Sequence, residues 1–486
     1  VILFFVGAYF EDAYKKKELP HFFKASAILA LAAVVGVCIN ISNLYHTYEY
    51  SKETMRGKSE LKQEGAAASQ ASSGLDRDYI TNWSYGIGET LTLLVPNVKG
   101  GGSGATMSQS EVAMAKANPM YSGIYSQFPR QYFGEQPWTA GPVYVGAFVM
   151  FLFVLGCFIV KGPLKWALLG ATIFSILLSW GKNFMGLTDF FIDYVPMYNK
   201  FRAVSSILVI AEFTIPLLAI FALKEILNKP DTLKLKENRG GVIATLVLTA
   251  GVALILAVAP GVSSSSFVTA QEIATLEQVL PAESRAQHLA PIVANLTEMR
   301  KAVVASDAWR SFFIIVIGCV LLFLYQQRKL KASFTLAGIA LLCLIDMWSI
   351  NKRYLNDEQF VPKSKQTEAF VKTQADEMIL QDTTLNYRVL NFIGFPGNTF
   401  NENNTAYWHK SVGGYHAAKL RRYQEMIDHH IMPEMQETYQ AVATAGGQMD
   451  SVDASKFRVL NMLNTKYFIF PAGEQGQAVP VVNPYA

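Results

Sequence analysis

Charged residues are scarce in this 486-residue sequence, where Asp, Glu, Lys and Arg together make up 16%. A soluble protein carries roughly 25%. Hydrophobic residues account for 51%, and the mean hydropathy is +0.22. This composition excludes an ordinary soluble enzyme and predicts a polytopic membrane protein. The net charge of +4 gives no indication of a nucleic-acid partner.

Cysteine is also rare. The four cysteines, Cys38, Cys157, Cys319 and Cys343, all lie in apolar segments, where a thiol behaves as a small hydrophobic group. This excludes a disulfide framework and a zinc site. The sequence also lacks an initial Met and the basic start of a signal peptide. We interpret residues 1–10 as the remnant of a helix that begins upstream, and the chain as an internal fragment.

Long apolar runs are abundant, and about 20 apolar residues suffice to span a bilayer. Complete spans are expected at seven places. They are roughly 22–42, 141–160, 163–180, 203–223, 241–262, 309–327 and 332–350. The sequence therefore predicts a mainly α, polytopic transmembrane helix bundle over residues 1–350.

Basic residues define the orientation of this bundle. Lysines and arginines gather at 15–24, 161–165, 224–239 and 328–331, which are alternate short loops under this span count. The positive-inside rule makes their side cytoplasmic. The long loops, and the tail from 351 to 486, are then extracytoplasmic.

The long segments have different expected structures. In the loop 43–140, EGAAASQASSG and KGGGSGATMSQS resemble flexible linkers, and DYITNWSYGIGETLTLLVPN is expected to be interfacial or re-entrant. Residues 351–486 are predicted to form an α/β domain, with helices in TEAFVKTQADEMIL and YHAAKLRRYQEMIDHHI and strands in YRVLNFI and FRVLNMLNTKYFIF.

Polar residues near the spans are candidate site residues. Lys200 and Arg202 lie at the outer mouth of a span, where a lipid phosphate would suit them, although snorkelling to the headgroups explains them equally well. Glu212 lies near the middle of that span, where carboxylates are usually functional; a structural polar contact is the simpler alternative. Asp189 and Asp193 could hold a metal or act as a base, but a surface turn is the favoured interpretation.

Two further segments carry cations. Glu49, Glu53, Arg56 and Glu60 would share one helix face, from which Arg56 could meet a phosphate; a solvated helix with ion pairs explains the spacing as well. In WHKSVGGYHAAKLRRYQEM, Trp408, His409, Tyr415 and His416 offer flat rings and hydrogen-bond donors for a sugar. Lys419, Arg421 and Arg422 are expected along a helix, where they would bind phosphate or anionic lipid.

Three stretches carry a family resemblance: LSWGKNFMGLTDFFIDYVPMYNKFRAVS, TYEYSKETMRGKSEL and TFNENNTAYWHKSVGGYHAAKLRRYQEM. They resemble the bacterial YfhO-like membrane proteins, which are similar to GT-C glycosyltransferases. The resemblance implies transfer of a sugar from a polyprenyl-phosphate donor to an envelope glycan, outside the cytoplasmic membrane of a bacterium. It also implies that the catalytic carboxylate lies upstream of Val1. Arg56, Lys200 and Arg202 would then bind the phosphate, and Trp408, His409, Tyr415 and His416 the sugar or acceptor.

The predicted partners are membrane lipids, the polyprenyl-phosphate sugar and the acceptor glycan. No cofactor is indicated, and a divalent metal is left open. Two alternatives remain. A transporter or flippase of lipid-linked glycans would use Glu212 and Pro216 at the midplane and needs further intramembrane charges, of which the sequence offers Asp346. A non-enzymatic scaffold would bind envelope glycan through the tail domain.

Overall fold

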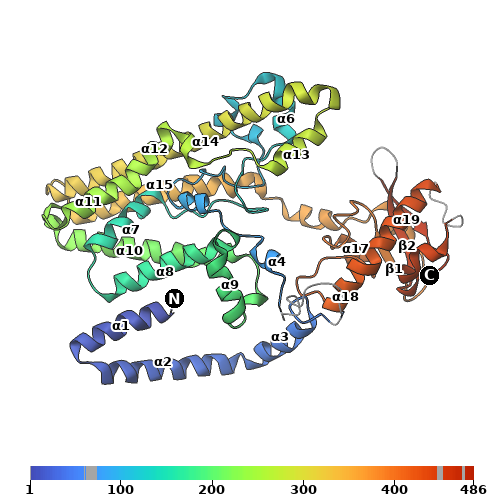
Figure 1. Cartoon of the computed structure of the whole chain (residues 1–486), viewed down its shortest axis with the longest axis horizontal. Helices are drawn as coiled ribbons and strands as arrows, with labels where there is room; N and C mark the ends of the chain where they lie inside the picture. The colour runs from blue at the N-terminus through green and yellow to red at the C-terminus, as the bar shows by residue number, and fades with distance from the viewer. Residues whose placement is uncertain (1, 60, 62–73, 446–451, 473–476) are drawn as a thin grey trace. The chain divides into compact units, whose positions relative to one another are not determined.

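The structure is a computed structural model, and it describes residues 2–59, 61, 74–445, 452–472 and 477–486. The chain divides into two compact units. The first contains residues 1–34 and 76–357, and the second contains residues 35–75 and 358–486. The stretch that follows the first span therefore belongs to the same unit as the C-terminal residues. Figure 1 shows the elements of both units.

The first unit is a helix bundle. Its long helices are α1 (Ile2–Lys16), α2 (Leu19–Ile39, which continues into the second unit), α7 (Ala147–Ile159), α8 (Pro163–Ser179), α9 (Met185–Tyr194), α10 (Val209–Asn228), α11 (Arg239–Leu246), α12 (Val252–Val258), α13 (Ala270–Val279), α14 (Ala282–Gln326) and α15 (Ala332–Tyr354). Shorter turns are α4 (Arg77–Thr81), η2 (Ile87–Leu93), α5 (Glu111–Met114), α6 (Ser122–Gln127), η6 (Tyr198–Lys200) and η7 (Val204–Leu208).

The described residues contain five helical segments that are long and apolar enough to cross a membrane. They are Leu19–Ile39, Val204–Asn228, Arg239–Val258, Ala282–Gln326 and Ala332–Gln359. A sixth is counted if α8 and the helical segment that follows it, bent by 110°, form one broken span. The chain therefore has the helices of a multi-pass membrane protein.

The helix found for the expected span 141–160 is shorter than predicted. Its helix α7 begins only at Ala147 and has 13 residues, about 20 Å at 1.5 Å per residue. The hydrocarbon core is about 30 Å thick. Residues 141–146, just before α7, form no helix or strand and are half-buried or buried; irregular backbone in a membrane protein is tolerated at membrane depth only where protein buries it.

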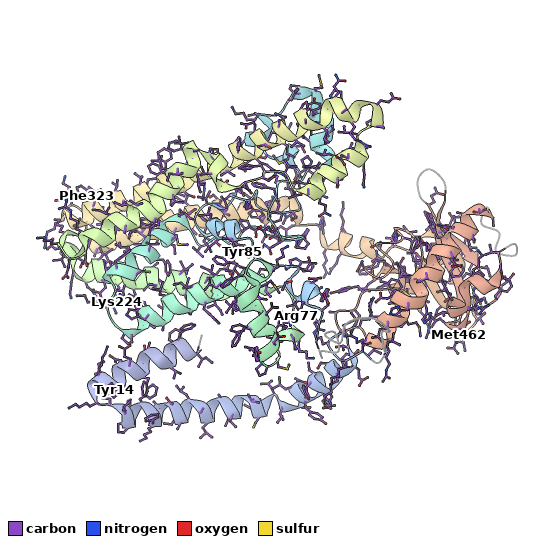
Figure 2. The ribbon with its side chains drawn as sticks, in the orientation of Figure 1. Tyr14, Arg77, Tyr85, Lys224, Phe323 and Met462 are labelled. Carbon is purple, nitrogen blue, oxygen red and sulfur yellow. The ribbon has the colours of Figure 1, made fainter. Side chains whose placement is uncertain are left out.

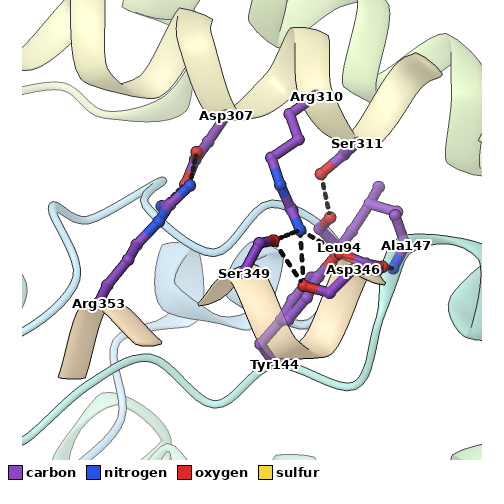
Figure 3. Close-up of polar contacts among 9 residues, drawn as sticks. All are labelled: Leu94, Tyr144, Ala147, Asp307, Arg310, Ser311, Asp346, Ser349 and Arg353. Carbon is purple, nitrogen blue, oxygen red and sulfur yellow. Dashed lines mark hydrogen bonds and ion pairs between the residues drawn. The ribbon is translucent and has the colours of Figure 1, made fainter. Parts of the chain in front are cut away.

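A carboxylate from another helix explains where α7 begins. The backbone N of Ala147 donates to Asp346 Oδ2 of α15 at 2.9 Å, so Asp346 satisfies one of the N–H groups that a helix start leaves unpaired. Tyr144 and Arg310 also donate to this carboxylate, as Figure 3 shows. A second ion pair, between Arg353 and Asp307, joins the same two helices, α14 and α15.

Glycine lets the bundle pack closely around α7. A Cβ on Gly318 of α14 would lie 2.2 Å from the Phe148 ring, and one on Gly156 would lie 3.1 Å from Leu218 of α10. Small residues at such crossings let helix backbones approach one another in membrane proteins. The span α7 is consequently buried at the centre of the bundle, among α8, α10 and α14.

The glycine run at 100–102 is packed and is not the flexible linker that its composition predicted. Gly100, Gly101 and Gly102 are all buried. A Cβ on Gly100 would lie 1.8 Å from the carbonyl oxygen of Gln131, and one on Gly102 would lie 2.7 Å from that of Ala140. Glycine is needed here because other backbone passes directly over it. The other expected linker lies mostly outside the described residues.

The expected outer loop 263–308 is also ordered. Most of it is helix: α13, and the first half of the 45-residue α14. These helices enclose a second apolar cluster with α5 and α6. Arg300 is buried there and bonds both carboxylate oxygens of Glu272. The span that was expected from residue 309 is thus the second half of a longer helix.

The second unit is built on a three-stranded sheet of order β1-β2-β3, with β1 and β2 parallel and β2 and β3 antiparallel. Its elements are α3 (Ile41–Glu53), η12 (Lys363–Phe370), α16 (Gln374–Ile379), β1 (Arg388–Asn391), α17 (Asn404–Trp408), α18 (Arg421–Met426), η13 (Ile427–Ile431), α19 (Met432–Thr444), α20 (Arg458–Met462), β2 (Thr465–Ala472) and β3 (Gln477–Val482).

Alternating side chains place helices on both faces of this sheet. Phe468 and Phe470 pack with η13 and α19, whereas Ile469 packs with α16. Alternate strand residues point to opposite faces, so both faces are covered. The predicted second strand begins only at Thr465, because the second RVLN forms helix α20.

Candidate functional site

A small pocket, with a cavity volume of about 10 Å³, lies in the first unit, where the residues before α7 meet the segment 85–101. Eleven residues line it: Tyr85, Glu89, Thr92, Lys99, Gly101, Tyr132, Gln136, Thr139, Gly141, Pro142 and Val143. Figure 2 labels Tyr85 in this part of the bundle. The lining combines a carboxylate, an amine and two phenols with backbone at glycine.

Glu89 is the buried anion of this pocket, with 1% of its surface exposed. Its Oε1 accepts from Tyr132 Oη and from Glu135 N (2.9 Å). Its Oε2 accepts from Gly86 N (3.1 Å) and from Gln136 Nε2 (3.3 Å). Four donors compensate a buried carboxylate for lost hydration. Glu89 therefore joins the start of η2 to residues 132–136.

The surroundings of Glu89 keep Tyr132 protonated. Burial, followed by the charge of Glu89, raises the pKa of Tyr132 far above its ordinary value. The hydroxyl thus stays a donor to Glu89. The nearby Gly134 leaves room for the carboxylate, since a Cβ there would lie 1.7 Å from Glu89 Oε1.

Lys99 is the cation of the pocket. Its Nζ donates to Ser264 Oγ at 2.8 Å and lies 5.4 Å from the centre of the Phe133 ring. Burial lowers its pKa, and the negative charges of Glu89 and Glu135 act in the opposite direction. A half-buried amine can bind an anion, because a nearby negative charge favours the charged form of the amine.

The η2 segment is fastened to the end of α8 and to the segment before α7. Tyr85 N donates to Ser179 O at 2.8 Å, and Trp180 Nε1 donates to Thr90 Oγ1 at 3.0 Å. Thr92 Oγ1 donates to Val143 O at 2.9 Å. Residues 93–98 pack into the same apolar core as the span helices. The wall of the pocket is therefore part of the bundle.

A cationic and aromatic cluster adjoins the pocket. The Arg202 guanidinium lies 5.3 Å from the Tyr79 ring and 5.4 Å from the Trp83 ring, and Nη1 donates to Tyr79 Oη. Gln136 links the two places, because its Nε2 donates to Glu89 while its Oε1 accepts from Ser205 Oγ at 3.2 Å. Glu89 is thus linked through Gln136 to Ser205, three residues after Arg202.

The backbone around Arg202 is in an uncommon conformation. Met197 and Ala203, which are not glycines, have φ of +69° and +62°. Such residues cost of order 1–3 kcal/mol each and persist where surrounding structure imposes them. They border the segment that carries Lys200 and Arg202, so this segment has a shape that local sequence disfavours.

Asp189 and Asp193 form a surface cluster with Arg77. Arg77 Nη1 donates to Asp189, and Nη2 donates to Asp193 Oδ1 at 2.6 Å. The two aspartates therefore fix α4 against α9. Among the described residues, no group of three Asp, Glu, His or Cys side chains could hold a metal ion.

Glu212 lies in the first turn of α10 and is exposed. The span begins at Val204 with η7 and runs to Asn228, so more of it follows Glu212 than precedes it.

The remaining candidates lie in the second unit. His409 is buried, and its ring Nε2 lies 2.9 Å from Asp376 Oδ1, so it faces the interior. Trp408 is half-buried at the end of α17, with Lys372 Nζ 4.6 Å from its ring. Tyr415 and His416 are exposed. The prediction that these residues and Lys200–Arg202 hold one ligand stays a prediction.

The two expected cationic helices are shorter than predicted. Helix α3 ends at Glu53, so Arg56 lies beyond it and donates from Nη1 to Ala417 O at 3.2 Å; Glu60 lies outside the described residues. Helix α18 begins at Arg421, which leaves Lys419 in the preceding extended stretch. Arg421 itself binds backbone carbonyls of Met55 and Gly57.

No protein-family model matches the chain, and no curated protein or solved structure matches it. The case for a function therefore rests on the pocket.

Sequence reasoning missed Glu89 and Lys99. The one available signal was a glutamate in the otherwise uncharged stretch between Ile80 and Val98.

Proposed function

We propose that the protein is a membrane glycosyltransferase that moves a sugar from a polyprenyl-phosphate donor to an envelope glycan or polymer outside the cytoplasm. The observation that carries the proposal is the pocket, in which Glu89 and Lys99 lie beside the irregular backbone before α7. A lipid-linked sugar has an apolar chain that stays in the bilayer and a polar head. The pocket is small, and it is the charged and phenolic side chains of its lining that suit the phosphate of that head.

Positive charge would stabilise the leaving phosphate. In the reaction, an acceptor hydroxyl oxygen attacks the anomeric carbon of the sugar, and the bond from that carbon to the phosphate oxygen breaks. The electron pair of that bond stays on the lipid phosphate, where negative charge grows. Lys99 and Arg202 are the cations that we assign to this charge, and preorganised donors of this kind are usually the largest catalytic contribution.

A carboxylate is needed to take the proton of the acceptor hydroxyl. Glu89 is unsuited, because its oxygens already accept from four donors and its task is to hold the pocket together. Glu135 directly follows Gly134, and its backbone N donates to Glu89 Oε1. The side chain of Glu135 is exposed. Among the described residues its oxygens have no hydrogen-bond partner. We assign Glu135 as the base, in place of a carboxylate upstream of Val1.

The orientation fits an extracytoplasmic reaction. If the basic turns of the bundle are cytoplasmic, the pocket faces the outside, as the resemblance to YfhO-like proteins and GT-C enzymes implies. The transporter alternative has less support, because Asp346, the further intramembrane charge that it would use, is paired with Arg310.

The test is sugar transfer by the purified chain in nanodiscs, with labelled polyprenyl-phosphate sugars and envelope glycan acceptors. We expect Glu135→Gln to lower kcat about 100-fold or more, as loss of a general base does, with donor binding retained. The matched control is Glu277→Gln, which changes an exposed carboxylate on α13 in the same way and should leave transfer unchanged.

The outcomes separate the alternatives. Full activity of Glu135→Gln would remove Glu135 as the base and return attention to a carboxylate upstream. Donor binding without transfer by the unchanged chain, combined with flipping of the donor in liposomes, would favour the transporter. Binding of the acceptor glycan alone would favour the scaffold.

A further inference from the structure

Helix α3 has an exposed apolar stripe that begins directly after a membrane span. Ile41, Leu44, Tyr45 and Tyr48 are 51–59% exposed. At 3.6 residues per turn they share one face of the helix. Tyrosine is enriched at membrane–water boundaries because its ring is apolar and its hydroxyl is polar. The stripe therefore has the composition of a helix face that contacts lipid headgroups.

The opposite face of α3 is attached to the rest of its unit. Tyr50, on the other side of the helix from Tyr48, donates from Oη to Ala418 O at 3.3 Å. Just beyond the helix, Thr54 pairs with Leu420 as an isolated β-bridge, and Met55 N donates to Lys419 O at 3.0 Å. Helix α3 is thus held to its unit on one face, while the apolar face stays uncovered.

The span before α3 fixes the depth of the stripe. No charged residue occurs in the 20 residues from Ala25 to Leu44, which as a helix measure about 30 Å, the thickness of the hydrocarbon core. Helix α2 has none of its apolar window buried by protein. If Lys24 marks one boundary of the bilayer, the other lies within the first turn of α3, just after Asn40, whose φ of −101° and ψ of 8° interrupt the helix between α2 and α3.

A cation completes the pattern. Lys52 lies on the same face as the stripe, one turn after Tyr48, and its Nζ is 4.5 Å from the Tyr48 ring centre. A lysine that extends past an interfacial ring keeps its stem on apolar surface and its ammonium among headgroup phosphates.

We infer that the stripe of α3 is an interfacial anchor, embedded in the headgroup layer of the bilayer, and that it holds the second unit at the membrane surface through the strap of residues 54–59. The strap is tied at several points. Arg421 Nη1 donates to Met55 O and Gly57 O at 3.3 and 3.0 Å, and Ser59 Oγ donates to Glu425 Oε1. The lipid layer is the partner of this face, independently of whether the protein transfers sugar.

Fluorescence quenching in nanodiscs tests the inference on the whole chain. The four native cysteines are replaced by alanine, and a single cysteine at Tyr48→Cys or Asn43→Cys carries an environment-sensitive dye. Asn43 is on the face of α3 opposite the stripe but closer to α2. Lipid-borne nitroxide is expected to quench the dye at position 48 more strongly than at position 43, with blue-shifted emission at 48.

The order of the two positions decides the result. If α3 simply projects into water, position 43 is nearer to the bilayer and the order is reversed, which overturns the inference. A dye at position 48 that neither lipid nitroxide nor aqueous iodide quenches means that protein covers the stripe, which also overturns it. The pair Tyr45→Cys and His46→Cys repeats the comparison if the Tyr48 variant fails to fold.

Discussion

Lys99 lines the pocket, and its charge should change within a pH range that a binding assay can cover. Burial lowers its pKa from the ordinary value, which is about 10.4 for lysine. A lowered pKa means that the charged form is lost at a lower pH than in a solvated lysine. If Lys99 binds the donor phosphate, binding is strong below the lowered pKa and weakens as the pH rises through it.

The corresponding prediction concerns polyprenyl-phosphate affinity measured against pH. Affinity should fall on the alkaline side before an ordinary lysine would titrate. Lys99→Arg should remove this fall, because guanidinium stays charged throughout the range. An alkaline fall of the same position and size in the Arg variant would contradict the role of Lys99.

Gly134 provides a second test at the residue scale. In Gly134→Ala the new Cβ would lie 1.7 Å from Glu89 Oε1, so the carboxylate must move away from its donors. We expect a loss of stability of about 1–3 kcal/mol, typical of overpacking, together with loss of transfer. Denaturant unfolding in detergent measures the first effect. Gly123→Ala is the control, since nothing lies within 4 Å of a Cβ there; an equal loss in both variants would contradict the account.

The sequence could indicate Arg202 but could not find its partners. Arg202 was noticeable because a cation at an outer helix mouth is disfavoured, and the structure gives it the Tyr79 and Trp83 rings. Glu89 bonds to residues 132–136, more than 40 positions away. Neither periodicity nor spacing encodes such a contact in one sequence. The burial of His409 could not be predicted for the same reason, since it depends on Asp376, 33 positions away.

At the scale of elements, hydropathy located the long helices well and their ends poorly. The apolar runs predicted the spans near 22–42 and 332–350, because lipid imposes a length of about 20 apolar residues. The start of α7 depends on Asp346, which no local pattern reveals. The repeated RVLN is a strand at 388–391 and a helix at 458–461. Tertiary packing therefore decides the structure where local preference is weak.

Asp346 allows a prediction about how elements are joined. Asp346→Ala removes the buried partner of the half-buried Arg310 and one cap of α7. Breaking one side of a buried ion pair typically costs 3–5 kcal/mol, so we expect a loss of about 3 kcal/mol or more in unfolding free energy. Denaturant unfolding in detergent is the measurement.

A control and a rescue accompany this experiment. Asp357→Ala removes an exposed partner of Lys352 and should change stability by less than about 1 kcal/mol. Arg310→Leu combined with Asp346→Ala should recover part of the loss, because it removes the unpaired buried charge. A double variant no more stable than Asp346→Ala would show that the capping of α7, and not the ion pair, dominates.

At the scale of the whole first unit, its basic turns meet at one end of the bundle (Figure 1). Lys161 Nζ lies 4.0 Å from Glu237, and Arg328 lies 3.8 Å from Asp231. These contacts bring the turns after α7, α10 and α14 together, as alternation of the basic loops predicted. The lining of the pocket comes from the other ends of the same helices, near the end of α8 and the start of α7.

This arrangement predicts labelling by a membrane-impermeant maleimide in intact cells. On a cysteine-free background, Lys161→Cys and Lys329→Cys should remain unlabelled until the cells are permeabilised, because the positive-inside rule places their turns in the cytoplasm. Glu283→Cys, at the first turn of α14 and therefore at the far end of the same long helix, should be labelled at once. Detergent-solubilised protein is the control, in which all three exposed positions must react.

Labelling of Lys161→Cys in intact cells, with Glu283→Cys protected, would invert the topology. The pocket would then face the cytoplasm, and the proposed transfer to an envelope glycan would have no acceptor on its side of the membrane.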